Sequence, residues 1–324
     1  MQSADIDAMT WQQHRWLNRI QSLSLLVLMG GFLTLLGWLL WGPPGMLMLL
    51  TVGVTGIMLN PSTSPRWVMR LYGAKRLSPE HAPSLWQALS ILSQRAGLRN
   101  VPSLYYVPSR VLNAFAVGAP RGSAIALTDG LIRQLNIREF LGVLAHEMSH
   151  IVNNDLWVMG LADLFSRTTS MLSLLGQFLL ILNLPLVLVG AATISWWAIL
   201  LLIFAPNLSA LAQLALSRTR EYDADLNAVR LTGDPQGLIS ALAKIEELQG
   251  GWMERILLPG RRVPEPSLLR THPRTEDRIS RLLALKPDMP ALLAGNYGPA
   301  ELLTVEHDRL ISHSPRWHVT GLWH

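Results

Sequence analysis

The sequence predicts a membrane protein that is mainly α-helical, with four transmembrane helices in two hairpins and a cytoplasmic α+β domain containing a small β-sheet. Three observations predict this fold class. Half of the 324 residues are hydrophobic and only 15% are charged. Two long segments contain no charged residue at all, and the polar segments between them carry both helix and strand patterns. The first two observations indicate that lipid is the solvent for part of the chain.

Composition narrows the classes of function and of metal site. The formal net charge is only +5, and no basic block is interleaved with aromatic residues, so nucleic-acid binding has no support. The chain contains no cysteine. Disulfide bonds and thiolate ligands are therefore excluded, and a metal site would have to use His, Asp or Glu.

The two charge-free segments are residues 20–65 and 168–217. A bilayer crossing takes about 20 apolar residues, so each segment has room for two crossings and a tight turn. Residues that end helices interrupt both segments, at 41–45 (Trp-Gly-Pro-Pro-Gly) and at 183–185 (Asn-Leu-Pro). The sequence therefore predicts four helices, at residues 20–41, 46–59, 168–182 and 186–206.

Loop charges predict the orientation of these helices. Neither hairpin tip carries Lys or Arg, whereas the flanking segments carry Arg15, Arg19, Arg66, Arg70, Lys75, Arg76, Arg218 and Arg220. By the positive-inside rule the flanking segments face the cytoplasm. A cleaved signal peptide is disfavoured because a long polar stretch precedes the first apolar segment and a second apolar stretch follows at once.

The segment 66–167 has the patterns of a folded α+β domain. Apolar residues at helical spacing from Leu85 to Leu92, followed by Gly97, predict a helix. Asn136 and Glu139 have the spacing of a capping box and predict the start of another helix. Three strands are expected at 103–107, 113–117 and 124–128, the last two forming a hairpin through the turn at 118–122.

The helix that begins near Glu139 carries a His-Glu-x-x-His pattern. His146 and His150 are four residues apart on one helix face, so both imidazoles can reach one ion. Glu147 is rotated off that face and can take a proton from a metal-bound water, whose pKa zinc lowers to about 7. A chance match on a solvated helix is the alternative, but the flanking residues are apolar, and buried ionisable groups need partners or a metal.

A catalytic zinc needs a third protein ligand and one open position. Soon after His150 the only acidic candidates are Asp155 and Asp163, whereas Glu221 and Asp225 lie beyond the second apolar segment and share one helix face. Glu221 is the predicted third ligand. Asp225 is predicted to accept a hydrogen bond from a ligand histidine and fix its ring. A solvated acidic patch is the alternative interpretation of these residues.

The two halves of this predicted site lie on either side of the apolar segment 168–217. An even number of crossings in that segment places both halves on the same side of the membrane. A single crossing would separate the ligands. The hairpin and the metal site therefore support each other, although different residues predict them.

Four groups of residues, taken together, resemble the HtpX-type membrane metallopeptidases, gluzincin relatives of the CAAX prenyl proteases. They are residues 113–118, the motif 146–150, the segment 221–225, and Thr271-His272-Pro273 with Arg278. The resemblance covers roughly residues 20–283, and the combination is far more specific than any single motif. It implies a zincin-type catalytic domain in two parts, with one zinc ion bound by His146, His150 and Glu221, and Glu147 as general base and acid.

The resemblance also implies roles for residues that the patterns alone do not single out. Asn113 and Ala114 would lie in an edge strand that pairs with extended substrate. His272 and Arg278 would lie beside the developing oxyanion, where a donor is worth about 2.7–4 kcal/mol. Arg274 is an equally reachable cation. Without the resemblance, Asn113 and Ala114 would be assigned to an ordinary hairpin strand. His272 would be a loop histidine and Arg278 a solvated charge on a helix.

The expected organisation therefore has six segments: a cytoplasmic N-terminal segment (1–19), a first hairpin (20–65), a first catalytic part (66–167), a second hairpin (168–217), a second catalytic part (218–286) and a tail (287–324). The loop-like stretch 250–268 is expected to be a surface loop, with a lid over the cleft as the alternative. The tail, which contains four histidines and two tryptophans, is expected to pack or to bind a partner rather than to hold a second metal.

The leading functional expectation is a zinc endopeptidase of a bacterial-type inner membrane that cleaves membrane or misfolded proteins, as membrane quality control under stress in the family implies. Its partners would be polypeptide substrates and the lipid bilayer. A narrow processing peptidase of the CAAX type is the first alternative. The second alternative is a non-catalytic membrane scaffold or transporter with a structural metal. A structural site would give Glu147 no role. A transport pathway would require an ionisable residue inside an apolar segment, and neither segment contains one.

Overall fold

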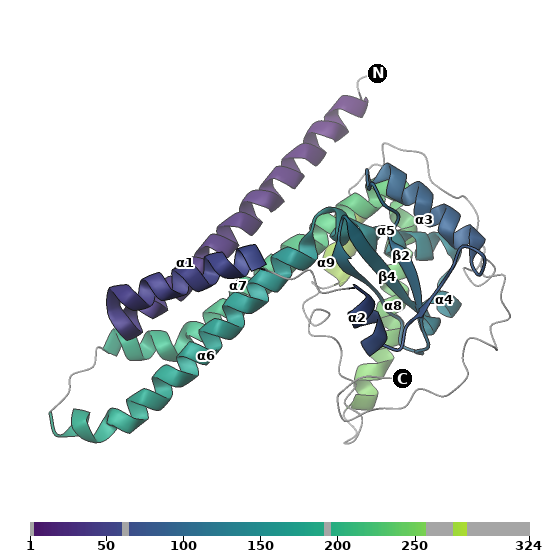
Figure 1. Ribbon diagram of the computed structural model, residues 1–324. Helices are drawn as coiled ribbons and strands as arrows, with labels where there is room; N and C mark the ends of the chain where they lie inside the picture. The colour runs from purple at the N-terminus through teal and green to yellow at the C-terminus, as the bar shows by residue number, and fades with distance from the viewer. Residues whose placement is uncertain (1–2, 60–64, 191–195, 257–274, 284–324) are drawn as a thin grey trace. The chain divides into compact units, whose positions relative to one another are not determined.

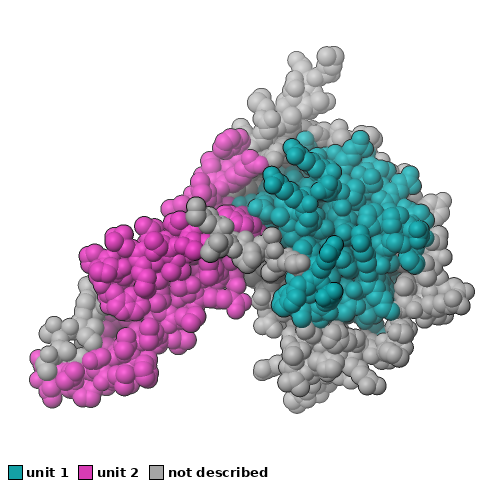
Figure 2. Space-filling view, in the orientation of Figure 1, with its two compact units in different colours: residues 1–12, 62–156, 220–324 teal, residues 13–61, 157–219 magenta. Residues whose placement is uncertain are grey.

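The computed structural model describes residues 3–59, 65–190, 196–256 and 275–283. The chain forms two compact units (Figure 2). Unit 1 comprises residues 1–12, 62–156 and 220–324, and unit 2 comprises residues 13–61 and 157–219. The expected loop 250–268 and tail 287–324 fall mostly outside the described residues. The exception is 250–256, which is helical rather than a loop and ends α8 (Pro235–Ile256).

Unit 2 contains most of α1 (Ser3–Leu59), which turns back on itself at Gly42 (Figure 1). Gly42 has φ 67° and ψ −155°, outside the helical region, and Pro43 and Pro44 follow it in the first turn of the second arm, where missing N–H groups cost little. A Cβ on Gly37 would lie 2.6 Å from the carbonyl oxygen of Gly45, so the two arms meet at glycine. The predicted break at 41–45 is present.

The other long helices are α6 (Asp155–Leu188) and α7 (Trp196–Thr232). The predicted break at 183–185 is absent, because α6 continues through Pro185 to Leu188. The chain leaves the helix where Gly190 takes a φ of 73°, which a residue without a Cβ adopts at little cost. A proline removes one backbone donor, which a long apolar helix tolerates. The expected helices 168–182 and 186–206 are thus replaced by longer ones with different ends.

Among the residues that the structure describes, three helical segments are long and apolar enough to cross a membrane, within Arg19–Thr55, Asp155–Leu186 and Ile199–Thr232. The first of them contains both arms of α1. Many large apolar side chains of unit 2 are exposed, for example Met171, Leu174 and Leu188, as expected for surfaces in contact with lipid. Phe165 packs against Gly30 and Gly53, one glycine from each arm of α1.

Unit 1 is built on a four-stranded mixed sheet in the order β1-β2-β4-β3. The strands are β1 (Lys75–Arg76), β2 (Ser103–Val107), β3 (Ala114–Ala119) and β4 (Gly122–Thr128). β3 and β4 are the predicted hairpin, with Ala119 opposite Gly122, and β4 runs parallel to β2. The short β1 was not predicted. Two residues are too few to show an alternation, so no sequence pattern predicts this strand.

Alternating residues of β4 face different layers. Ile125 and Leu127 belong to the main core beneath α3 (Pro83–Arg95) and α5 (Ile137–Val152), whereas Ala124 and Ala126 pack with Met69 of α2 (Pro65–Leu71). This is the period of two expected of a strand buried on both faces. The remaining helices are α4 (Asp129–Gln134), α8, which packs against α5, and α9 (Thr275–Leu283), which packs against α8 (Figure 1).

Candidate metal centre

The start of α5 is fixed by its cap and by α8. The Asn136 side chain accepts a hydrogen bond from the backbone N–H of Glu139, and the Glu139 carboxylate accepts one from the backbone N–H of Asn136, which completes the predicted capping box. Glu139 is also bonded by Ser240 Oγ (2.6 Å) and Lys244 Nζ (3.1 Å) of α8. The helix that carries the metal motif is therefore anchored at its N-terminus.

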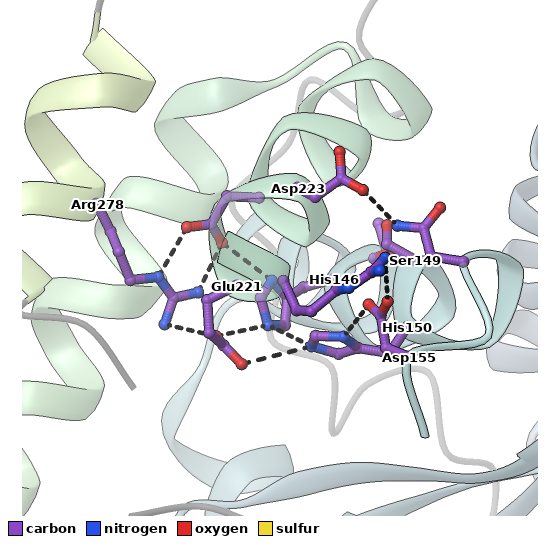
Figure 3. Close-up of polar contacts among 11 residues, drawn as sticks. His146, Ser149, His150, Asp155, Glu221, Asp223 and Arg278 are labelled. Atoms are coloured by element: carbon purple, nitrogen blue, oxygen red, sulfur yellow. Dashed lines mark hydrogen bonds and ion pairs between the residues drawn. The ribbon is translucent and has the colours of Figure 1, made fainter. Parts of the chain in front are cut away.

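His146 and His150 project from one face of α5 toward Glu221 of α7 (Figure 3). Their Nε2 atoms are 3.2 Å apart. Glu221 Oε2 lies 3.4 Å from His146 Nε2, and Glu221 Oε1 lies 3.7 Å from His150 Nε2. One ligand atom from each of the three residues lies within 4.8 Å of the others. The structure thus brings together the three residues predicted to be ligands.

The two shortest of these separations, 3.2 and 3.4 Å, are close to those around a tetrahedral zinc ion. Zinc bonds of about 2.0–2.2 Å at tetrahedral angles separate neighbouring ligand atoms by about 3.3–3.6 Å. The donor set has the same chemistry, because two imidazoles and one carboxylate leave the fourth position open for water or substrate. Two Nε2 atoms that face each other at 3.2 Å also need a cation or a proton between them.

The outer nitrogen of each histidine meets an aspartate. His146 Nδ1 lies 3.0 Å from Asp225 Oδ1, and His150 Nδ1 lies 2.8 Å from Asp155 Oδ2. An Nδ1–H held by a carboxylate fixes the tautomer in which the Nε2 lone pair is free to bind a metal. The sequence predicted this role for Asp225, whereas it considered Asp155 only as an alternative ligand.

Arginines lie against these carboxylates. Arg278 of α9 donates from Nε and Nη2 to the two oxygens of Asp225 (2.7 and 2.6 Å), and its Nη1 lies 3.4 Å from Glu221 Oε2. Arg220 of α7 donates from Nη1 to Asp155 Oδ1 at 3.1 Å. Arg278 thus forms a bidentate pair with Asp225, because two buried carboxylates lie within its reach. Its place beside the oxyanion stays a prediction.

Neighbouring carboxylates raise the pKa values of two groups in the site, His146 and Arg278. Burial alone would lower the pKa of His146, but Asp225 and Glu221 outweigh it and raise the pKa to about 10. Burial also opposes the charge of Arg278, but Asp225 above all, then Glu221 and Glu147, raise the pKa of its guanidinium. Glu147 is therefore close enough to Arg278 to act on its charge, and it is half-buried beside the histidines.

Asn113 and Ala114 lie at the start of the edge strand β3. The Asn113 N–H donates to Thr128 Oγ1 (2.9 Å), and its carbonyl oxygen accepts from that hydroxyl (2.7 Å). Ala114 is buried on the α5 side of the sheet. No strand pairs with the outer edge of β3 among the residues that the structure describes. His272 and Arg274 lie outside the described residues.

Asp155 and Arg220 were missed as members of the site. Asp155 follows the end of α5, where Asn154 takes a φ of 57°, and it is this reversal of the chain that returns its carboxylate to His150. Asparagine tolerates a left-handed conformation better than most residues. The Asn153-Asn154-Asp155 run was the one available signal, because it predicts a turn.

Comparison with known proteins identifies the family of the chain. Residues 79–286 match peptidase family M48. Proteins named "Protease HtpX homolog" from Desulfatibacillum aliphaticivorans and Pyrococcus furiosus are 32% and 34% identical to the chain, covering 83% and 82% of it and 90% and 95% of their own lengths. The crystal structure of S. mikatae Ste24p aligns with a TM-score of 0.43 at 20% identity, over 83% of this chain and 66% of that one. The chain therefore belongs to peptidase family M48, as a metalloendopeptidase of the HtpX type.

Proposed function

We propose that the protein is a zinc-dependent endopeptidase of a bacterial-type inner membrane, with four crossings and its catalytic domain facing the cytoplasm. The observation that carries the proposal is the convergence of His146, His150 and Glu221, with both outer imidazole nitrogens held by aspartates. Two imidazoles and a carboxylate around an open fourth position are typical of a catalytic zinc site rather than a structural one.

A bound zinc supplies Lewis acidity, which polarises the scissile carbonyl and makes a water molecule acidic near neutral pH. Glu147 accepts the proton of the attacking water and passes it to the leaving amine. His146, His150 and Glu221 hold the metal, and Asp225 orients the His146 ring. We assign the oxyanion donor to His272. Arg278 neutralises Asp225 and Glu221, since its Nε and Nη2 are bonded to Asp225.

The outer edge of β3, with which no described strand pairs, supports extended binding of the substrate. An edge strand offers main-chain donors and acceptors to any extended polypeptide, and this gives affinity without demanding one sequence. We propose that a substrate segment pairs along β3, beginning near Asn113 and Ala114. Because β3 packs against the metal-bearing helix α5, a segment bound there lies in the same unit as the candidate zinc site.

Membrane or misfolded proteins are the proposed substrates, in keeping with a role in membrane quality control under stress. Segments that cross the membrane lie directly beside the site in sequence, because Asp155 begins α6 and Glu221 lies on α7. A narrow peptidase for prenylated tails remains the alternative. Comparing cleavage of an unfolded membrane protein with that of a prenylated peptide separates the two.

The decisive experiment uses purified full-length protein in detergent. We expect about one zinc per chain, loss of casein cleavage after chelation and its return with zinc. The Glu147→Gln protein should retain zinc and lose activity by at least about 100-fold, because general acid–base catalysis contributes about 10²–10⁴-fold. Exposed Glu247 of α8 provides a matched control, and Glu247→Gln should leave both zinc and activity unchanged. Cleavage at the parental rate by Glu147→Gln would contradict the mechanism.

A further inference from the structure

Asp155 links a predicted zinc ligand to a second charged residue. Its Oδ2 accepts the hydrogen bond from His150 Nδ1 at 2.8 Å, and its Oδ1 accepts one from Arg220 Nη1 at 3.1 Å. Both side chains are largely buried, with 3% of Asp155 and 12% of Arg220 exposed. Figure 3 shows Asp155 beside His150. Each carboxylate oxygen thus has a different partner, and the carboxylate has little freedom to turn.

The backbone around Asp155 also has a well-defined position. Helix α5 ends at Val152, the left-handed Asn154 reverses the chain, and Asp155 begins α6. Asn153 Nδ2 donates to Asp223 Oδ2 at 3.2 Å, which ties the turn to α7. The turn is therefore fixed on two sides, by α7 through Asn153 and by Arg220 through Asp155.

The arrangement repeats one already found at the other histidine. His146 is held by Asp225, and Asp225 is paired with Arg278. In both cases the order is histidine, aspartate, arginine. Both histidines lie on α5, but the aspartate and arginine come from α6 and α7 at His150 and from α7 and α9 at His146. A buried carboxylate needs a compensating positive charge, and a ligand imidazole needs an acceptor for its outer N–H. Arg220 and Asp155 supply these two requirements at His150.

We propose that Asp155 and Arg220 are positioning residues for the zinc site. Asp155 holds the His150 ring so that its Nε2 lone pair points at the metal, and Arg220 holds and neutralises Asp155. The pair also joins the first residue of α6 to α7, the two helices of the second apolar segment, at the ligand itself. This inference rests on the proposed zinc function, because it assigns the residues by what they do to a zinc ligand.

The test measures zinc affinity by competition with a chromophoric chelator, on full-length protein in detergent. Asp155→Asn keeps the shape but loses the charge, and Arg220→Ala removes the cation. Each should weaken zinc binding by about 10–100-fold, the usual effect of losing an outer partner of a ligand histidine. Arg220→Lys should recover part of the affinity, because a lysine supplies the charge but a single donor direction.

Matched controls lie on the same two helices. Arg218 of α7 is exposed, and Asp163 of α6 forms an exposed pair with Arg167. Arg218→Ala and Asp163→Asn should bind zinc like the parent. An equal loss of zinc affinity in a control and in its matched variant would overturn the proposal, because any change of charge on the helix would then be enough to weaken zinc binding.

Two further readouts separate positioning from simple destabilisation. The visible absorption spectrum of the cobalt(II)-loaded protein reports the geometry of the ligands, and Asp155→Asn should shift it at saturating metal. In excess chelator, the melting temperature of each variant should differ from that of the parent by less than the increase that zinc produces in the parent. An unchanged cobalt spectrum together with unchanged zinc affinity would overturn the proposal. Failure of the parent itself to bind zinc would instead contradict the proposed function.

Discussion

Arg278 is the residue on which the charge balance of the candidate site depends most. Only 6% of its side chain is exposed, and it faces two carboxylates that are themselves buried, Asp225 and Glu221. A buried carboxylate that loses its partner keeps the cost of leaving water and gains nothing in return. The sequence placed Arg278 near the site through the family resemblance. It did not indicate the carboxylate pairing, because α9 and α7 are far apart in the chain.

Arg278→Ala should lower the stability of the metal-free protein by about 3–5 kcal/mol, the cost of breaking a buried ion pair on one side. A zinc ion held by Glu221 and His146 would bring positive charge close to Glu221 and Asp225, so the loss of stability should be smaller in the presence of zinc. Denaturation in detergent with chelator and with zinc measures both values.

Arg281 of α9 provides the control for that measurement. It is exposed, and its guanidinium lies 3.7 Å from the centre of the Tyr222 ring. Arg281→Ala should cost only about 0.5–1 kcal/mol, the value of an exposed cation–π contact, with and without zinc. An equal loss in Arg278→Ala and Arg281→Ala would show that Arg278 does not compensate buried charge.

At the scale of elements, α5 depends on Glu139. Burial by itself would raise the pKa of Glu139, but hydrogen bonds from Ser240, from the backbone N–H of Asn136 and from Lys244 outweigh it and lower the pKa. The carboxylate therefore stabilises the folded state above its unfolded pKa of about 4.3, and this stabilisation disappears as the pH falls through the lower folded value. Acid should loosen the junction of α5 with α8.

Glu139→Gln should make the stability of the metal-free protein less dependent on pH below about 5, because glutamine keeps the capping-box hydrogen bond but does not titrate. The parent should lose more stability than the variant between about pH 5 and pH 3. Urea denaturation in detergent and chelator measures the difference. Glu247→Gln, on the exposed side of α8, should follow the parent, and a parallel pH profile for Glu139→Gln would contradict this role.

Elements whose signal lies within a few residues were predictable from the sequence. The capping box of Asn136 and Glu139, the hairpin 114–128 and the break at Gly42 depend on local backbone preferences, and the structure contains all three. The helix was predicted to end at residue 182, before Pro185, but it continues to Leu188, because the cost of a proline depends on the surroundings of the helix. The pair of Asp155 and Arg220 has no local signal, since packing brings together residues from separate helices.

At the scale of the whole molecule, the number of membrane crossings decides whether the site is complete. Both halves of the candidate site belong to unit 1, which the chain leaves at residue 156 and re-enters at residue 220. With α6 and α7 as two crossings, residues 156 and 220 lie on the same side of the bilayer. The two arms of α1 raise the total to the four proposed crossings.

Because the protein has no cysteine, single cysteines introduced at chosen positions test this topology directly. Pro44 and Val189 lie at the two hairpin tips, and Arg121 lies in the β3–β4 turn of unit 1; all three are exposed. In intact bacterial cells whose outer membrane admits the reagent, a maleimide that does not cross the inner membrane should label Pro44→Cys and Val189→Cys. Arg121→Cys should react only after the inner membrane is permeabilised, because the positive-inside rule predicts that unit 1 faces the cytoplasm. Labelling of Arg121→Cys in intact cells would reverse the orientation, and protection of Pro44→Cys would reduce α1 to a single crossing or a re-entrant helix.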